Sequence, residues 1–204
     1  MNILLVDDHA IVRDGLRRLL SGMAGGQIFE AAGGREAVGL ALRQKLDLII
    51  LDLNLPELGG LELLTRLLQT EAAPVLVFSM HAEPLYVTRA MAAGAHGYMT
   101  KNAAPDEILT AVRRITAGGR YVESELAQAL ALQTVAPTHT VDQLSARDLE
   151  ILRLLASGKS LSDIAGALGI GYKTVANTLS MMKAKIGVRG TAELVRVASE
   201  AGLT

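Results

Sequence analysis

The chain contains no cysteine and no tryptophan, and its aromatic residues are limited to four tyrosines and two phenylalanines. Without cysteine there is neither a disulfide framework nor a thiolate metal site. So few aromatic rings also make base stacking on an aromatic platform a poor explanation of function. These absences exclude disulfide-rich scaffolds, thiolate metal centres and stacking-based nucleic-acid binding.

The chain also lacks any apolar run long enough to span a bilayer, and its start, Met1-Asn2-Ile3, lacks the basic and apolar regions of a signal peptide. We therefore expect a cytoplasmic protein that makes no membrane contact. Half of the 204 residues are apolar, which is ample for packed cores in one or two domains.

The net charge of −1 conceals an uneven distribution. Residues 1–140 carry 12 Lys and Arg against 15 Asp and Glu, whereas residues 141–204 carry 8 against 6. An acidic first part and a mildly basic second part suggest different partners, although a difference of this size can also arise by chance.

From Asn2 to about Gly118, short β-rich runs alternate with amphipathic segments, a pattern typical of βα units around a parallel sheet. In the last amphipathic segment Ile108, Val112 and Ile115 recur at the spacing of a core-facing helix stripe. We therefore predict an α/β domain with a doubly wound sheet of five parallel strands. The strands are expected at 2–6, 27–31, 47–51, 74–79 and 95–99, and the helices at 9–21, 34–44, 58–70, 83–93 and 104–117.

A second, purely helical pattern begins at Leu144. The run before it, 135–140, has no periodicity and contains the helix breaker Pro137, whereas 121–133 is helix-permissive. Ser145 is a plausible N-cap for the first helix. The predicted helices span 146–156, 161–168, 172–186 and 191–202. The predicted organisation is a first domain at 1–118, a helical segment and linker at 119–143, and a small all-α domain at 144–204.

Acidic residues close two of the predicted strands. Asp7 and Asp8 follow the first strand, and Asp52 follows the third. Because the carboxyl ends of parallel strands meet at one edge of the sheet, these carboxylates should lie close together. Crowded carboxylates repel one another and resist joint ionisation unless a hard cation holds them. The pattern therefore predicts a magnesium-assisted phosphate site.

Two further polar residues follow the same rule, since Ser79 ends the fourth strand and Lys101 lies just beyond the fifth. A hydroxyl and an ammonium would neutralise the remaining oxygens of a bound phosphoryl group. Taken singly, Asp7 or Asp8 would more often be a helix cap or turn acid, and Ser79 would be structural. Jointly they favour phosphate chemistry. The four histidines have no metal-ligand spacing and are expected on loops or at the surface: His9, His81, His96 and His139.

The residues at these strand ends occur as an ordered set of motifs, namely Leu5-Val6-Asp7-Asp8-His9, Leu51-Asp52-Leu53-Asn54-Leu55-Pro56, Ser79 and Gly97-Tyr98-Met99-Thr100-Lys101. This set resembles the receiver domain of response regulators, over about the first 118 residues. The resemblance implies a flavodoxin-like strand order 2-1-3-4-5. It also implies that Asp52 accepts a phosphoryl group from a sensor histidine kinase.

The same resemblance assigns roles to the neighbours of Asp52. It implies that Mg²⁺ is held by Asp8, Asp52 and the backbone carbonyl of Asn54, with Asp7 helping through water. Lys101 would bind the phosphate. Ser79 and Tyr98 would form a switch pair, in which Ser79 is drawn toward the phosphoryl group and the Tyr98 ring rotates into the space that it leaves.

An enzyme is the main rival from a different functional class. Aspartyl-phosphate hydrolases also use Mg²⁺ and a lysine on a similar sheet, and they typically carry a second acid two residues after the nucleophile. This chain has Asn54 at that position, and an amide cannot act as a general acid. We therefore expect that this protein is not an enzyme and that its turnover is limited to slow self-dephosphorylation.

The carboxy-terminal pattern predicts two helices joined at Leu168-Gly169-Ile170-Gly171, a helix-turn-helix whose second helix, about 172–186, enters the major groove. Lys173-Thr174-Val175, Asn177 and Lys185-Ile186-Gly187-Val188 resemble the LuxR-type DNA-binding domain. Joined to a receiver, this module resembles the NarL/FixJ family of transcriptional regulators. The resemblance implies binding to double-stranded DNA, with a homodimer formed on phosphorylation.

The DNA-reading face departs from the family pattern, because Ala176 stands where a basic residue is usual and Thr178 where a histidine is usual. By alignment, Ala176, Asn177 and Ser180 would approach base edges, and Asn177 alone offers an amide for adenine. The groups expected to contact phosphates are Lys173, Thr174, Lys183, Lys185 and Arg189. With so few cations, a dimer is needed for useful affinity.

The recognition helix is also unusually apolar. Met182 is expected in the domain core, while Leu179 and Met181 are open to either core packing or a partner surface. If they form a partner surface, the alternative function is a receiver regulator that acts through protein contacts with a degenerate DNA-reading helix.

Overall fold

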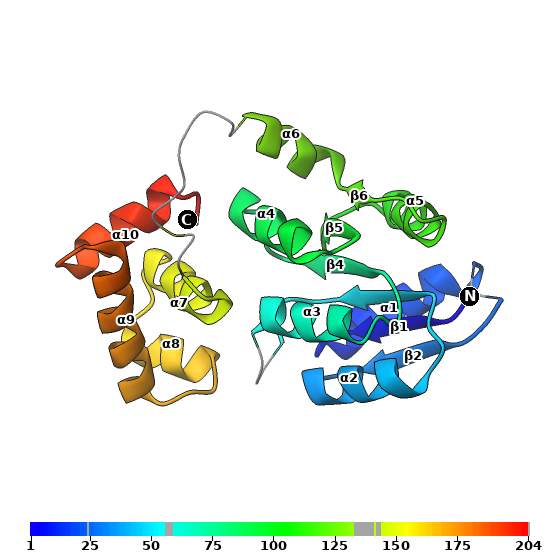
Figure 1. The fold of residues 1–204 in the computed structure, drawn as a ribbon, viewed down its shortest axis with the longest axis horizontal. Helices are drawn as coiled ribbons and strands as arrows, with labels where there is room; N and C mark the ends of the chain where they lie inside the picture. The colour runs from blue at the N-terminus through cyan, green and yellow to red at the C-terminus, as the bar shows by residue number, and fades with distance from the viewer. Residues whose placement is uncertain (24, 56–58, 133–140, 142–143, 204) are drawn as a thin grey trace. The chain divides into compact units, whose positions relative to one another are not determined.

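The computed structural model describes residues 1–23, 25–55, 59–132, 141 and 144–203 (Figure 1). The chain divides into two compact units, Met1–Leu132 and Gln133–Thr204. The first unit thus includes residues 119–132, which the sequence pattern assigned to a helical segment and linker. Within the described parts of the chain, no helix is both long and apolar enough to cross a bilayer.

The first unit is built on a parallel sheet with the strand order β2-β1-β3-β4-β5-β6. The strands are β1 Ile3–Val6, β2 Ile28–Ala31, β3 Leu48–Leu51, β4 Val75–Ser79, β5 Gly97–Thr100 and β6 Tyr121–Val122. The predicted order of the first five strands is confirmed. The predicted number is wrong by one, because β6 is a two-residue edge strand, too short to produce an alternating pattern, in a stretch that reads as helix-permissive.

Helices cover both faces of this sheet, in the layered arrangement that Figure 1 shows. On one face, Ile3 and Leu5 of β1 join a core with α1 and α5, and the predicted stripe of α5 lies in it fully buried. On the other face, α2, α3 and α4 pack side by side. Strands β1, β3, β4 and β5 are buried on both faces, which is why β1, β3 and residues 75–78 of β4 read as continuous apolar runs. The helices are α1 Ala10–Ser21, α2 Gly34–Arg43, α3 Gly60–Gln69, α4 Pro84–Ala93, α5 Pro105–Thr116 and α6 Ser124–Leu132.

The second unit is a helical bundle with α7 Ala146–Ala156, α8 Leu161–Ala167, α9 Tyr172–Ile186 and α10 Thr191–Glu200. The predicted cap at Ser145 is confirmed: its Oγ accepts the Asp148 N–H at 3.1 Å, and Asp148 Oδ2 accepts the Ser145 N–H at 2.9 Å. A second capping box at Ser160 starts α8. Gly169 has a φ of +61° in the turn between α8 and α9, a conformation that a side chain would strain. The helix-turn-helix therefore forms where the sequence predicts it.

Candidate phosphate site and helix-turn-helix

The carboxyl ends of three strands bring Asp7, Asp52 and Lys101 together. The Lys101 ammonium lies 2.7 Å from Asp52 Oδ2 and 2.7 Å from Asp7 Oδ2. Asp52 and Asp7 are only 1% and 2% exposed. This is the arrangement that the parallel-sheet argument predicts, since the three residues directly follow β3, β1 and β5.

Backbone hydrogen bonds fix the position of Asp52. Its N–H donates to the Val6 carbonyl at 2.8 Å, which continues the β1–β3 ladder, and its Oδ1 accepts the Asn54 N–H at 3.0 Å. The start of α3 supports the same turn, because a Cβ added at Gly60 would collide with the Leu53 carbonyl oxygen. Only glycine allows this close approach. The phosphate site is thus held by the sheet on one side and by α3 on the other.

The electrostatics of the site leave an excess of negative charge. Burial raises the pKa of Asp52, and the hydrogen bonds from Lys101 and the Asn54 N–H oppose that rise only in part. Burial alone would lower the pKa of Lys101, but the carboxylates of Asp52 and Asp7 outweigh it and raise that pKa. Lys101 is therefore an ammonium, and it cannot by itself balance the carboxylates of Asp7, Asp8 and Asp52.

These carboxylates form a cluster that could hold a metal ion. One ligand atom from each of Asp7, Asp8, Asp52 and His9 lies within 4.8 Å of the others. Asp8 keeps its side chain 32% exposed, so the cluster opens to solvent on one side. Oxygen donors with an open side suit Mg²⁺, which retains several waters and binds phosphate oxygens. The predicted ligands Asp7, Asp8 and Asp52 therefore fit a hard divalent cation.

His9 belongs to this cluster, although its spacing gave no reason to place it there. Its side chain is 64% exposed, in the loop expected from the sequence, and its Nδ1 lies 2.7 Å from Asp8 Oδ1 and 3.3 Å from Asp7 Oδ1. The ring follows the two acids directly in the chain, and that adjacency was the available signal. Imidazole is a poor ligand for Mg²⁺, so we assign His9 to hydrogen bonding with the carboxylates.

The predicted switch residues Ser79 and Tyr98 are both fully buried. The Tyr98 hydroxyl donates to the His81 carbonyl at 2.9 Å, and the His81 N–H donates to Ser79 Oγ at 3.3 Å. Burial raises the pKa of Tyr98, so the phenol stays neutral. The Tyr98 ring is thus held inside the domain in this structure, because its hydroxyl finds an acceptor in the loop after β4.

His81 lies in the loop after β4, as expected from the sequence, but it is buried and not at the surface. It is only 4% exposed, its Nε2 lies 2.5 Å from Asn54 Oδ1, and its ring stacks on Tyr86 with centroids 4.2 Å apart. The reason is tertiary, because the loop after β4 folds against the loop after β3. His81 stands two residues after Ser79, as Asn54 stands two residues after Asp52, and this parallel spacing is the signal that could have paired them.

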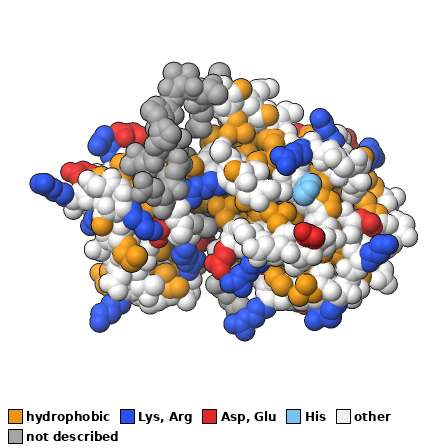
Figure 2. Space-filling model, viewed as in Figure 1, with side chains coloured by type: hydrophobic (Ala, Val, Ile, Leu, Met, Phe, Trp, Pro, Cys, Tyr) orange, Lys and Arg blue, Asp and Glu red, His pale blue; other side chains and the backbone are white. Residues whose placement is uncertain are grey.

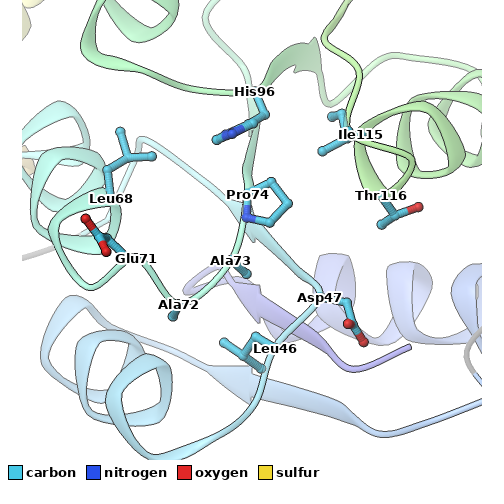
Figure 3. A pocket seen from close by; sticks show the side chains of 11 residues that line it. Leu46, Asp47, Leu68, Glu71, Ala72, Ala73, Pro74, His96, Ile115 and Thr116 are labelled. Carbon is cyan, nitrogen blue, oxygen red and sulfur yellow. The ribbon is translucent and has the colours of Figure 1, made fainter.

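A separate pocket of about 640 Å³ lies at the opposite, amino ends of the central strands (Figure 3). Its polar groups are partly engaged: Asp47 Oδ2 accepts the Asn2 N–H at 2.6 Å, and His96 Nδ1 accepts the Val75 N–H at 3.3 Å. Burial, with Arg120 nearby, lowers the pKa of His96, so the imidazole is neutral at ordinary pH. The described residues that line the pocket include no lysine or arginine, so it does not suit a phosphate.

The predicted DNA-contacting residues lie on α9. Lys173, Thr174, Asn177 and Ser180 are exposed, and Ala176 and Lys183 are half-buried. The Lys185 ammonium donates to Asp148 Oδ2 at 3.1 Å, which ties the end of α9 to the start of α7. Lys185 thus has a structural partner in addition to its predicted phosphate contact. Arg189, just beyond α9, is exposed.

The apolar residues of α9 separate into two groups. Met182 is fully buried, which confirms its place in the core, and Leu179 is only 4% exposed. The hypothesis that Leu179 forms a partner surface is wrong, because its side chain points into the bundle with Val175. Met181, by contrast, is 60% exposed. Of the two residues that the sequence left open, Met181 alone is available for a partner surface, so the support for a protein-binding recognition helix is reduced.

Charged side chains on the visible face of the second unit stand at separate points, with acidic residues among the basic ones (Figure 2). Within this unit, Arg147 pairs with Glu150 at 2.8 Å and Arg196 pairs with Glu200 at 2.6 Å. Neutralisation of DNA phosphates by cations supplies most non-specific affinity. A single copy of this unit is therefore expected to bind DNA weakly, as the small number of cations on α9 predicts.

Comparison with known families and proteins covers both units. The family described as response regulator receiver domain matches residues 3–113, and bacterial regulatory proteins, luxR family, match residues 142–198. The chain is 42% identical to the transcriptional activator protein ExaE of Pseudomonas putida, over all of this chain and 98% of that protein. It is 34% identical to the response regulator UvrY of Escherichia coli (strain K12), over all of this chain and 95% of that protein. A solved LuxR-family two-component response regulator from Aurantimonas sp. SI85-9A1 is 39% identical, with a TM-score of 0.62 over 66% of this chain and 98% of that one.

Proposed function

This chain belongs to the response regulators that join a receiver domain to a LuxR-type DNA-binding domain, and from that premise we propose that Asp52 is its phosphoacceptor and that phosphorylation controls its binding to DNA. The observation that carries the proposal is the contact of buried Asp52 with Lys101 at 2.7 Å, beside Asp7. An ammonium in that position can neutralise a phosphoryl group that arrives on Asp52.

The phosphoryl donor in this proposal is a phosphohistidine of a sensor histidine kinase. A carboxylate oxygen of Asp52 forms a bond to phosphorus as the phosphorus–nitrogen bond breaks, and the departing imidazole keeps the electron pair and takes a proton from water. Lys101 then contacts the phosphoryl oxygens. Asp8, Asp52 and the Asn54 carbonyl, with Asp7 acting through water, would hold Mg²⁺, and the ion would supply further charge neutralisation.

We propose no enzymatic turnover beyond slow self-dephosphorylation. A hydrolase would need a general acid or base beside the acyl phosphate. The side chain of Asn54 is an amide, and its Oδ1 is already engaged by His81 at 2.5 Å. The site therefore suits a phosphoryl group that persists long enough to act as a signal.

The proposed output is binding of double-stranded DNA by a phosphorylation-dependent homodimer. Two copies of α9 double the number of phosphate contacts and convert the second contact into an intramolecular one. A regulator acting through protein contacts alone is the second candidate, and its support is the exposed Met181 on α9. Exposed Lys173, Asn177 and Ser180 on the same helix favour DNA.

We expect Mg²⁺ to stabilise the receiver against heat. A ligand that binds only the folded state adds about 2.7 kcal/mol at a concentration of 100 times its Kd. Thermal unfolding in MgCl₂ and in EDTA, at matched ionic strength, measures the effect. Asp8→Asn should diminish the rise in Tm, whereas Asp106→Asn, at the exposed start of α5, should leave it unchanged. A Tm that is indifferent to Mg²⁺ would contradict the assignment of this site.

The proposed function as a whole is tested by DNA protection. The full chain, incubated with Mg²⁺ and beryllofluoride, should protect its own promoter region in a footprint at lower protein concentration than the untreated chain, and should sediment as a dimer. Sedimentation is measured on the same samples. Absence of protection at low salt in both states, with a normal dimer, would favour the protein-contact candidate.

A further inference from the structure

Glu123 is a buried acid that the proposed function does not use. It is 6% exposed and lies between β6 and α6. Its Oε2 accepts the Thr100 N–H at 2.6 Å, and its Oε1 accepts the Thr100 hydroxyl at 3.1 Å. Burying a carboxylate is costly unless such hydrogen bonds compensate for the lost water. The two bonds therefore hold Glu123 tightly to the end of β5.

The backbone of Glu123 explains why a side chain makes this contact. Its N–H donates to the Tyr98 carbonyl at 3.0 Å, which continues the β5–β6 ladder. Its own carbonyl accepts the Ala127 N–H at 2.9 Å and so begins α6. Because the Glu123 carbonyl is bonded to α6, it does not accept the next N–H of β5. The Glu123 carboxylate accepts that N–H, from Thr100, instead. One residue thus joins the last rung of the sheet to the first turn of α6.

Thr100, to which Glu123 is hydrogen-bonded, lies between two residues of the proposed phosphorylation site. Tyr98 precedes Thr100 by two positions, and Lys101 follows it directly. The Lys101 N–H donates to the Ser79 carbonyl at 2.9 Å, while its ammonium contacts Asp52. Any displacement of the Lys101 backbone must therefore strain or relax the bonds between Thr100 and Glu123.

Helix α6 connects this contact to the rest of the chain. It packs against α4 within the first unit, with Leu126 only 5% exposed, and Figure 1 shows it along that helix. It is also the last element before the residues that lead to the DNA-binding unit. A structural change at the first turn of α6 is therefore close in sequence to the residues that lead to the DNA-binding unit.

We propose that Glu123 is a positioning residue that holds Lys101 in its resting place and α6 on the receiver, and that phosphorylation of Asp52 loosens this hold. The proposal rests on Asp52 being the phosphoacceptor. A phosphoryl group lengthens the side chain at position 52, so Lys101 withdraws, Thr100 moves with it, and the carboxylate of Glu123 loses its two donors. Because coupling between sites is reciprocal, weakening this hold must also favour the phosphorylated form.

The test uses the full chain, with Mg²⁺ and beryllofluoride as the probe and hydrogen exchange of the α6 amides as the readout. In the wild type, beryllofluoride should speed this exchange at least about fivefold, the low end of typical couplings. In Glu123→Ala, exchange should be at least about tenfold faster already without the probe, because both hydrogen bonds to the carboxylate are removed and a single hydrogen bond to a charged group contributes about tenfold or more. In this variant, beryllofluoride should cause little further increase in the exchange rate.

A second readout separates coupling from simple damage. Glu123→Ala should bind beryllofluoride about fivefold more tightly than the wild type, because the resting position of Lys101 is no longer favoured. A merely structural role would leave this affinity unchanged or weaken it. Glu123→Gln, whose amide can still bond both Thr100 groups, should restore slow exchange. Glu125→Ala, an exposed acid in the same helix turn, should behave as the wild type in both assays.

The outcomes distinguish this proposal from the function on which it rests. If the wild type binds beryllofluoride while Glu123→Ala shows unchanged or weaker affinity, the role of Glu123 is overturned and that of Asp52 stands. If the wild type does not bind the probe, both are overturned. Should Glu123→Ala fail to fold, Thr100→Val, which removes the hydroxyl and keeps the N–H, should move both readouts in the same direction by a smaller factor.

Discussion

Asp52→Asn should abolish phosphorylation of this chain by a small phosphodonor such as acetyl phosphate, leaving no slower band on a Phos-tag gel. An amide oxygen cannot form the acyl phosphate that a carboxylate forms. The substitution keeps the size of the side chain, and the Lys101 ammonium retains Asp7 at 2.7 Å. Loss of phosphorylation would therefore report chemistry at position 52 and not a collapsed site.

The matched control is Asp47→Asn, which alters a half-exposed acid at the other end of β3 and should leave phosphorylation at the wild-type level. A retained phosphate band in Asp52→Asn would assign the acceptor to another residue, with Asp7 and Asp8 the next to test. Mass spectrometry of borohydride-reduced protein would locate it.

The same variant has an expected effect on stability. Burial raises the pKa of Asp52 in the folded protein above its unfolded value. A carboxyl with a raised folded pKa contributes stability that is fully present below its unfolded pKa and is lost as pH rises through the folded pKa. At neutral pH in EDTA, Asp52→Asn should therefore unfold no lower in temperature than the wild type. A clearly lower Tm would mean that the pair with Lys101 outweighs the cost of burying the charge.

Asn177→Ala should weaken specific DNA binding by roughly 10- to 100-fold, the loss expected when a bidentate contact to adenine worth about 1–3 kcal/mol is removed. Asn177 is exposed on α9 and is the one amide on the base-reading face that the family alignment indicates. Electrophoretic mobility shift with the beryllofluoride-treated chain measures the effect. Non-specific DNA should show little change.

Two further variants provide a comparison and a control for this result. Lys173→Ala should weaken binding to all sequences alike and should lower the salt slope by about one, because each lysine that neutralises a phosphate releases about one counterion. Ser199→Ala, at an exposed position of α10, serves as the control and should bind as the wild type. If Asn177→Ala binds its site as tightly as the wild type, the base-reading role of Asn177 is wrong. If no variant and no wild-type sample binds DNA while Met181→Ser abolishes partner recruitment, α9 is a protein-binding helix.

Several parts of this protein follow from local pattern. Apolar runs that end in Asp7, Asp52, Ser79 and Lys101 predict the strands and the shared edge at which these residues meet, because parallel strands present their carboxyl ends together. The stripe on α5 and the cap at Ser145 likewise depend on spacings within one element. The missed edge strand β6 marks the limit of this approach, since two residues carry no periodic signal.

By itself, the sequence determined five strands of the sheet, the meeting of the acids and the lysine at its edge, and the boundaries of the recognition helix, because each depends on a local pattern. The strand order followed from the resemblance to receivers. Only the tertiary structure decided which loops touch. The contact of His81 with Asn54 and that of Glu123 with Thr100 join residues 27 and 23 positions apart. The inward Tyr98 and the buried Leu179 also depend on neighbours from other elements. Such contacts arise from how elements pack, which the periodicity within a single element does not determine.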